Sequence, residues 1–128
     1  MRRSMLIAVL VLASLTPGSV EQKATSQEVV VVTVDSTNLR FSPSTVTITE
    51  GDSVRFFWSG ELLAHNAVAD DGLFDSGEPS REVDYSFTFE IGTNGTHTYV
   101  CEPHEAMGMV GTVVVELAPP VVPPEPEP

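Results

Sequence analysis

The feature that most constrains this chain is a two-residue alternation of apolar and polar side chains. In residues 83–90, written VDYSFTFE, apolar side chains take every odd position and polar ones every even position. This period places the apolar side chains on one face of a β-strand. Residues 53–58 show the same pattern, and the runs QEVVVVTV and VGTVVVEL are rich in β-branched residues, which favour strands.

Turn signals separate these runs. Gly-Asp at 51–52 and Thr-Asn-Gly-Thr at 93–96 are typical of tight connections. No segment after the N-terminal region keeps a helical period of 3.6 residues. The pattern predicts an all-β fold of about seven or eight short strands, an antiparallel sandwich or Greek-key barrel. We expect one such domain over residues 27–118.

The two ends of the chain differ from this domain. Two arginines precede an apolar run over residues 5–15, which is short for a membrane span but suits a secretory signal. We therefore predict a signal peptide plus short leader over 1–26 and a location in the periplasm or on the extracellular face. A core helix or an uncleaved anchor is the alternative. Residues 119–128 form a proline-rich tail, predicted to be extended and disordered, and the mature form should have no stable membrane span.

The charge restricts the partners. The chain has 6 basic and 18 acidic residues, a net charge of −12, which disfavours nucleic acid and anionic membranes. A cationic protein partner suits this charge, although adaptation to salt or plain solubility explains it equally well. The single cysteine excludes an intrachain disulfide, so metal ligation is a leading explanation for an unpaired thiol in an exported protein.

Residues 101–109, CEPHEAMGM, gather the softest donor atoms of the chain: its only cysteine, one of three histidines and two of four methionines. Two imidazoles and a thiolate with a distant thioether form the ligand set of blue copper sites. Cys101 and His104 belong to this stretch, so the second histidine must come from elsewhere.

Only two further histidines are available. His97 lies four residues before Cys101 on one predicted strand, which separates them by about 13 Å, too far to share a metal. We expect His97 to have a structural role. His65 begins a different segment that sheet packing could bring beside Cys101, so we take it as the second imidazole ligand.

At this point the chain resembles a known family. HNAVADDGLFDSG, followed by GTHTYVCEPHEAMGMVGTVVV, is similar to the small blue copper proteins, or cupredoxins, which include plastocyanin, pseudoazurin, amicyanin and halocyanin. The resemblance implies one type 1 copper ion held by His65, Cys101, His104 and Met109. Met109 follows from the spacing in plastocyanin and pseudoazurin, whereas the shorter amicyanin spacing would select Met107, which we otherwise expect on the outer surface of the loop.

The resemblance also implies how the ligand loops are joined. The backbone amide of Asn66 should donate to the Cys101 sulfur, and because Pro103 has no N–H we expect one such bond rather than two. Glu102 stands where plastocyanin-like proteins usually have Ser or Thr. This departure leaves the usual side-chain hydrogen bond to the asparagine unsupported.

We interpret the chain as a single-electron carrier rather than an enzyme. Its expected partners are redox proteins such as a cytochrome, an oxidase or a reductase, and the protein should be a monomer. The first alternative is copper delivery or storage on the same fold. Others are an enzyme with an open copper position, using Glu102 or Glu105, and a metal-free adhesion-like sandwich.

Overall fold

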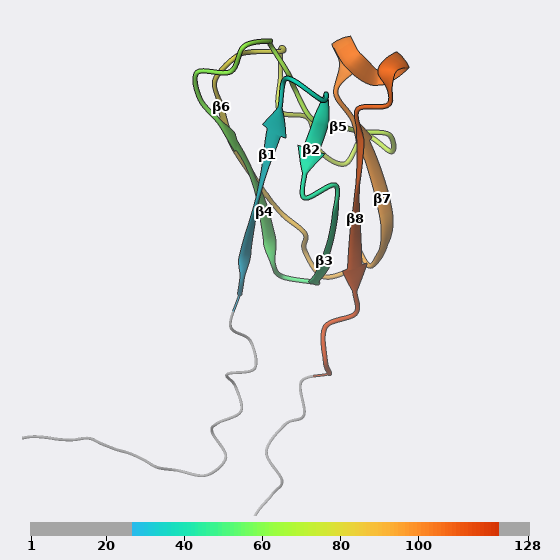
Figure 1. Cartoon of the computed structure of the whole chain (residues 1–128). Helices are drawn as coiled ribbons and strands as arrows, with labels where there is room; N and C mark the ends of the chain where they lie inside the picture. Colours follow the sequence, from blue (N-terminus) through green and yellow to red (C-terminus); the bar gives the residue numbers. More distant parts are fainter. Residues whose placement is uncertain (1–26, 121–128) are drawn as a thin grey trace, which may run out of the picture. The chain divides into compact units, whose positions relative to one another are not determined.

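Two facing β-sheets make up the domain (Figure 1). The computed structural model describes residues 27–120, so the predicted signal segment 1–26 and the tail from residue 121 lie outside the described residues. The elements are β1 (Val29–Asp35), β2 (Arg40–Ser42), β3 (Thr45–Thr49), β4 (Ser53–Trp58), β5 (Val68–Ala69), β6 (Val83–Thr88), β7 (Gly95–Val100), the 3₁₀ helix η4 (Glu102–Met107) and β8 (Val110–Glu116). Within this part of the chain, no helix is long and apolar enough to cross a membrane.

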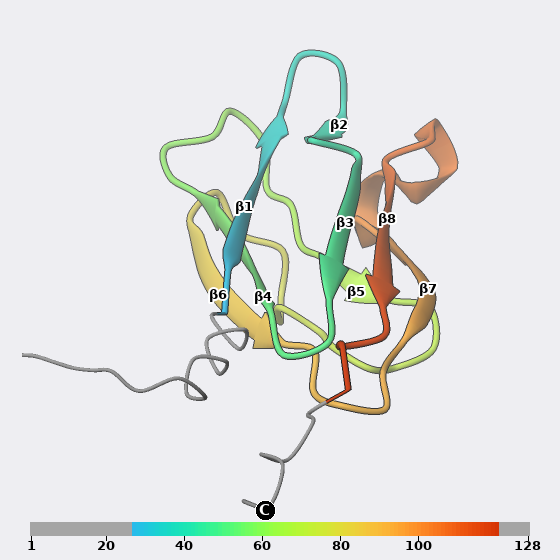
Figure 2. The ribbon, with the colours of Figure 1, turned by 90° about the horizontal axis from the view of Figure 1, so that it is seen from below.

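The strand order is β2-β1-β4-β6 in one sheet and β3-β8-β7-β5 in the other. Seen from below, β1, β4 and β6 lie on one side of the molecule and β3, β8 and β7 on the other (Figure 2). The prediction of an all-β sandwich is confirmed, but the expectation that its strands are antiparallel throughout is wrong. β1 pairs with β4 and β3 pairs with β8 in parallel. The chain crosses to the second sheet after β2 and returns to the first after β3. Side-chain alternation has the same period in either direction, so it carries no information on strand direction.

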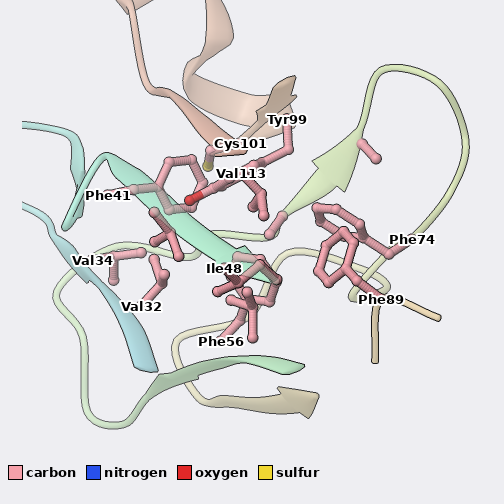
Figure 3. Close-up of a cluster of buried hydrophobic side chains, with 14 of the residues drawn as sticks. Val32, Val34, Phe41, Ile48, Phe56, Phe74, Phe89, Tyr99, Cys101 and Val113 are labelled. Atoms are coloured by element: carbon pink, nitrogen blue, oxygen red, sulfur yellow. The ribbon is translucent and has the colours of Figure 1, made fainter. Parts of the chain in front are cut away.

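Alternation does decide which side chains form the core. In β4 the side chains of Val54, Phe56 and Trp58 are buried while their neighbours are more exposed. The opposite sheet contributes Tyr99 and Val113, both fully buried. Figure 3 shows Phe56, Tyr99 and Val113 among the aromatic and branched side chains of one cluster, with Cys101 at its edge. The prospective ligand thiol is therefore fully buried and belongs to the hydrophobic core.

Two buried carboxylates fasten the end of the domain where β3 turns into β4. Glu50 accepts hydrogen bonds from the backbone N–H groups of Gly92, Asn94 and Ala118. Asp52 accepts from Glu28 and Thr49. Except for Thr49, the last residue of β3, these donors lie outside the strands, and the carboxylates satisfy their backbone N–H groups. They stabilise the end remote from Cys101, which lies beyond the opposite end of β7.

Candidate metal centre

The three predicted nitrogen and sulfur ligands converge at one end of the sandwich. The Cys101 Sγ lies 3.6 Å from the His65 Nδ1 and 3.4 Å from the His104 Nδ1. One donor atom from each of the three residues falls within 4.8 Å of the others. Two donors bonded tetrahedrally to the same small cation at about 2.0–2.3 Å stand about 3.3–3.8 Å apart, so these separations fit a shared transition ion.

Cys101 and His104 are placed by the short loop that joins β7 to β8. Cys101 directly follows β7 and its backbone N–H donates to the Met109 carbonyl at 3.1 Å, which draws the two ends of the loop together. Between them η4 turns the chain so that the His104 N–H bonds the Cys101 carbonyl at 3.0 Å. Gly108 ends this helix at φ 87°, a left-handed conformation that favours glycine.

His65 comes from a separate segment that is fixed against residue 80. The backbones of His65 and Ser80 exchange two hydrogen bonds, at 3.0 and 2.9 Å. The indole of Trp58 donates to the same Ser80 carbonyl at 3.0 Å and packs edge-on to the His65 ring. The buried Trp58 side chain, at the end of β4, thus helps to fix the position of the His65 imidazole.

The two methionines of the loop occupy opposite environments. Met109 is fully buried, whereas Met107 is 57% exposed, as the sequence predicts for the outer surface of the loop. The Met109 backbone is bonded to both loop ligands, because its carbonyl accepts from Cys101 and its N–H donates to the His104 carbonyl at 3.3 Å. Burial beside the ligands favours Met109 over Met107 as the thioether donor.

Burial also sets the protonation of the donors. It raises the pKa of the Cys101 thiol, and the nearby backbone N–H groups of Asn66 and His104 oppose this shift. The His104 N–H donates to the Cys101 carbonyl. The expectation of one backbone donor to the sulfur, from Asn66, stays a prediction. Burial lowers the pKa of His65, and the neighbouring His104 lowers it further, which favours the neutral imidazole that binds metals.

The departure at Glu102 is compensated by the longer side chain. The Asn66 Nδ2 donates to the Glu102 carboxylate at 2.8 Å and to the Gly77 carbonyl at 2.9 Å, while the Glu102 N–H donates to the Asn66 Oδ1 at 2.9 Å. The carboxylate accepts the bond that a Ser or Thr hydroxyl would take. The asparagine therefore joins both ligand-bearing loops.

His97 lies away from the donor cluster, as predicted. Its Nδ1 bonds the Asp71 carboxylate and its Nε2 bonds the Thr93 carbonyl, each at 2.7 Å. Both acceptors lack protons, so both ring nitrogens must carry one. This structural role accounts for both ring nitrogens.

Sequence reasoning missed two polar side chains behind His65. The Ser36 Oγ lies 2.9 Å from the His65 Nε2 and donates to the Glu61 carboxylate at 2.7 Å. Ser36 follows β1 and Glu61 follows β4, so nothing in their local sequence links them to the ligand cluster.

Comparison with known proteins places this geometry in context. The sequence model of the copper binding proteins, plastocyanin/azurin family, matches residues 28–116. The chain is similar to halocyanin of Natronomonas pharaonis, 36% identical over 77% of this chain, and to chloroplastic plastocyanin of Tetradesmus obliquus, 39% identical over 64% of this chain. It spans 63% and 62% of the lengths of these two relatives. The structure is similar to native pseudoazurin of Hyphomicrobium denitrificans, with a TM-score of 0.53, 30% identity, and coverage of 68% of this chain and 74% of that one.

Proposed function

The chain belongs to the plastocyanin/azurin family of copper-binding proteins, and from this premise we propose that it carries single electrons between redox partners. Copper is its metal, and we assign His65, Cys101, His104 and Met109 as the ligands. The observation that carries the proposal is the convergence of one thiol and two imidazole nitrogens within 4.8 Å. When bound among such soft donors, copper supplies a one-electron couple between Cu(I) and Cu(II).

The residues around the donors keep their arrangement rigid. Cys101 and His65 are both fully buried, each anchored to a sheet or to a bonded backbone pair. Rigid donors limit the rearrangement that accompanies a change of charge. The same burial favours retention of the metal over its release, and this distinguishes an electron carrier from a protein for copper delivery or storage.

His104 provides the route to the surface. It is the one partly exposed member of the three-donor cluster, and it lies within the exposed loop formed by η4. Ala106 and Met107 are exposed beside it in sequence. We propose that partners dock on this exposed loop and exchange electrons through the His104 ring.

The N-terminal pattern supports export across the cytoplasmic membrane, and the acidic surface supports a cationic redox partner. Glu102 was a candidate for an open, catalytic copper position. Its carboxylate bonds Asn66, which supports a role in holding the loops together. Export, partner and monomeric state all remain predictions.

The test is a visible absorption spectrum of the purified domain after addition of Cu(II). We expect a strong blue band, reversible one-electron cycling, and slow loss of copper to a chelator. Cys101→Ser should abolish the band, and Ser53→Ala, at a solvent-exposed pair remote from the donors, should leave it unchanged. A colourless protein that yields its copper rapidly would support delivery or storage instead.

His104→Gly tests the electron route. Because the substitution leaves a gap at the surface, exogenous imidazole should restore the blue band. Electron exchange should be slow without imidazole and recover with it. Retained copper with unchanged exchange rates would count against the route.

A further inference from the structure

The hydrogen bonds behind His65 form a chain of three groups from separate parts of the sequence. The His65 Nε2 lies 2.9 Å from the Ser36 Oγ, and the Ser36 hydroxyl lies 2.7 Å from the Glu61 Oε1. The Leu63 backbone N–H also points to the Ser36 oxygen, at 3.3 Å. The serine is half-buried, at the point where the turn after β1 reaches the His65 segment.

The number of protons available decides which group donates in each of these hydrogen bonds. A serine hydroxyl has one proton and two lone pairs, and a carboxylate only accepts. The single proton of Ser36 is therefore given to Glu61, which leaves both lone pairs to accept. One accepts from Leu63 N–H, and the other must accept from His65 Nε2–H.

The proton on Nε2 determines the state of the other ring nitrogen of His65, Nδ1. A neutral imidazole has one N–H and one free lone pair. With the proton on Nε2, the lone pair of His65 is on Nδ1, the atom that faces the Cys101 sulfur at 3.6 Å. A hydrogen bond to the second nitrogen is the usual way in which proteins fix the orientation and tautomer of a metal-binding histidine.

Glu61, at the far end of this series of hydrogen bonds, is itself held in place. The Glu61 N–H donates to the Arg81 carbonyl at 3.1 Å, and the Arg81 guanidinium donates back to the Glu61 carbonyl. On the serine side, Asp35 accepts from the N–H groups of Thr37 and Asn38 and so closes the turn. Ser36 and Glu61 therefore both extend from backbone that hydrogen bonds hold in place, and Ser36 contacts the imidazole.

We propose that Ser36 and Glu61 are positioning residues that hold the proton of His65 on Nε2 and so present Nδ1 to the metal before it binds. We call the hydrogen-bonded series Glu61–Ser36–His65 the relay. Its proposed role rests on the proposed function, because it takes His65 as a ligand. Its own signature, however, is a proton on His65 that is observable in the metal-free protein.

The first experiment is ¹⁵N-resolved NMR of the His65 imidazole in the metal-free full chain. We expect a hydrogen-bonded Nε2–H signal that exchanges slowly with water. In Ser36→Ala the signal should shift and exchange faster, and Ser36→Thr, which keeps the hydroxyl, should restore it. Glu61→Gln keeps the shape of the side chain but adds an amide donor. The Ser36 hydroxyl is then free to turn towards Nε2, and exchange should rise.

The second experiment measures copper affinity by competition with a Cu(I) chelator. Ser36→Ala should weaken binding by about 10-fold, the lower end of what loss of such a supporting bond costs. Ser53→Ala and Glu90→Gln, at the far end of the sheet, are the matched controls and should have no effect. An unchanged Nε2–H in both Ser36→Ala and Glu61→Gln would overturn the relay. Absence of a blue band in the wild type would contradict the proposed function, and the metal-free NMR result would still decide the relay.

Discussion

Asn66 and Glu102 are joined by two hydrogen bonds that run in opposite directions, one from the Asn66 amide to the Glu102 carboxylate and one from the Glu102 backbone to the Asn66 carbonyl oxygen. Asn66 is fully buried, next to His65 in sequence, and Glu102 is next to Cys101. The pair therefore connects the two segments that carry the metal ligands.

Asn66→Ala should lower the free energy of unfolding of the metal-free protein by about 3 kcal/mol, because it removes three hydrogen bonds worth about 1 kcal/mol each. Urea denaturation measures this. Asn94→Ala, an exposed asparagine in a turn, is the control and should cost far less. A cost for Asn66→Ala no larger than that of the control would show that the connection contributes little.

Gly111→Ala should also be strongly destabilising. A Cβ at Gly111 would lie 2.2 Å from Cζ and 2.4 Å from Oη of Tyr99, whose ring is fully buried between the sheets. Overpacking of this kind costs about 1–3 kcal/mol. Thermal denaturation should show a lower midpoint, and the loss should shrink when the ring is removed in a Tyr99→Leu background. An equal loss in both backgrounds would contradict the contact.

The ion pair of His97 and Asp71 should make stability depend on pH. Burial lowers the pKa of His97, but the bonds to the Thr93 carbonyl and the Asp71 carboxylate outweigh it and raise that pKa above 6.5. The folded protein then holds this proton more tightly than the unfolded chain. The added stability is complete below pH 6.5 and is lost as pH rises through the raised pKa.

Asp71, the partner of His97, makes stability depend on pH in the opposite direction, at low pH. Its bond to His97 lowers the pKa of Asp71 below 3.8, so its contribution is lost only as pH falls through that lowered value. Because the Asp71 side chain is 48% exposed, solvent screening limits the pair to about 0.5–1 kcal/mol. The stability difference between wild type and Asp71→Asn should be largest near pH 6 and diminish towards pH 8. A difference independent of pH would contradict the pair.

Met109→Leu and Met107→Leu should change the reduction potential of the copper site by different amounts. A thioether donor stabilises Cu(II) more than Cu(I), so removing it should raise the potential. We expect a clear rise for buried Met109 and little change for exposed Met107, measured by voltammetry. Both substitutions conserve volume, and Met109→Leu should cost less than about 1.5 kcal/mol in stability. A larger shift for Met107→Leu would reverse the assignment.

Acidic residues near His65 should steer a cationic partner. Of the acidic residues that follow His65, Asp84 is paired with Arg55 and Asp71 with His97. Glu78 and Glu82 are exposed. Glu78 follows Gly77, whose carbonyl bonds Asn66, and Glu82 precedes β6 at the end where Val83 pairs with Trp58.

Oxidation by a trivalent cationic metal complex should therefore slow as salt rises from about 10 to 150 mM, where screening shortens to about 8 Å. Glu78→Gln with Glu82→Gln should reduce this dependence several-fold. Glu90→Gln with Glu116→Gln removes the same charge at the opposite end of the strands and should reduce it less. Equal effects would assign the steering to net charge alone.

The amino-acid sequence by itself determined the strands and indicated which residues could supply the metal donors. Alternation along 83–90 predicts a half-buried strand, because side chains two residues apart share a face. The spacing from Cys101 to Met109 fits within one short loop, so local sequence contained that part of the site. The elimination of His97 also needed only the rise of a strand.

Other features depended on groups that meet only in the folded chain. Strand direction in the β1–β4 and β3–β8 pairs, the bond from Glu102 to Asn66, and the approach of Ser36 and Glu61 to His65 all join distant segments. Hydrophobic periodicity reports which face of an element is buried, not which element packs against it. Tertiary packing therefore decided which polar groups support the ligands and which nitrogen of His65 faces the sulfur.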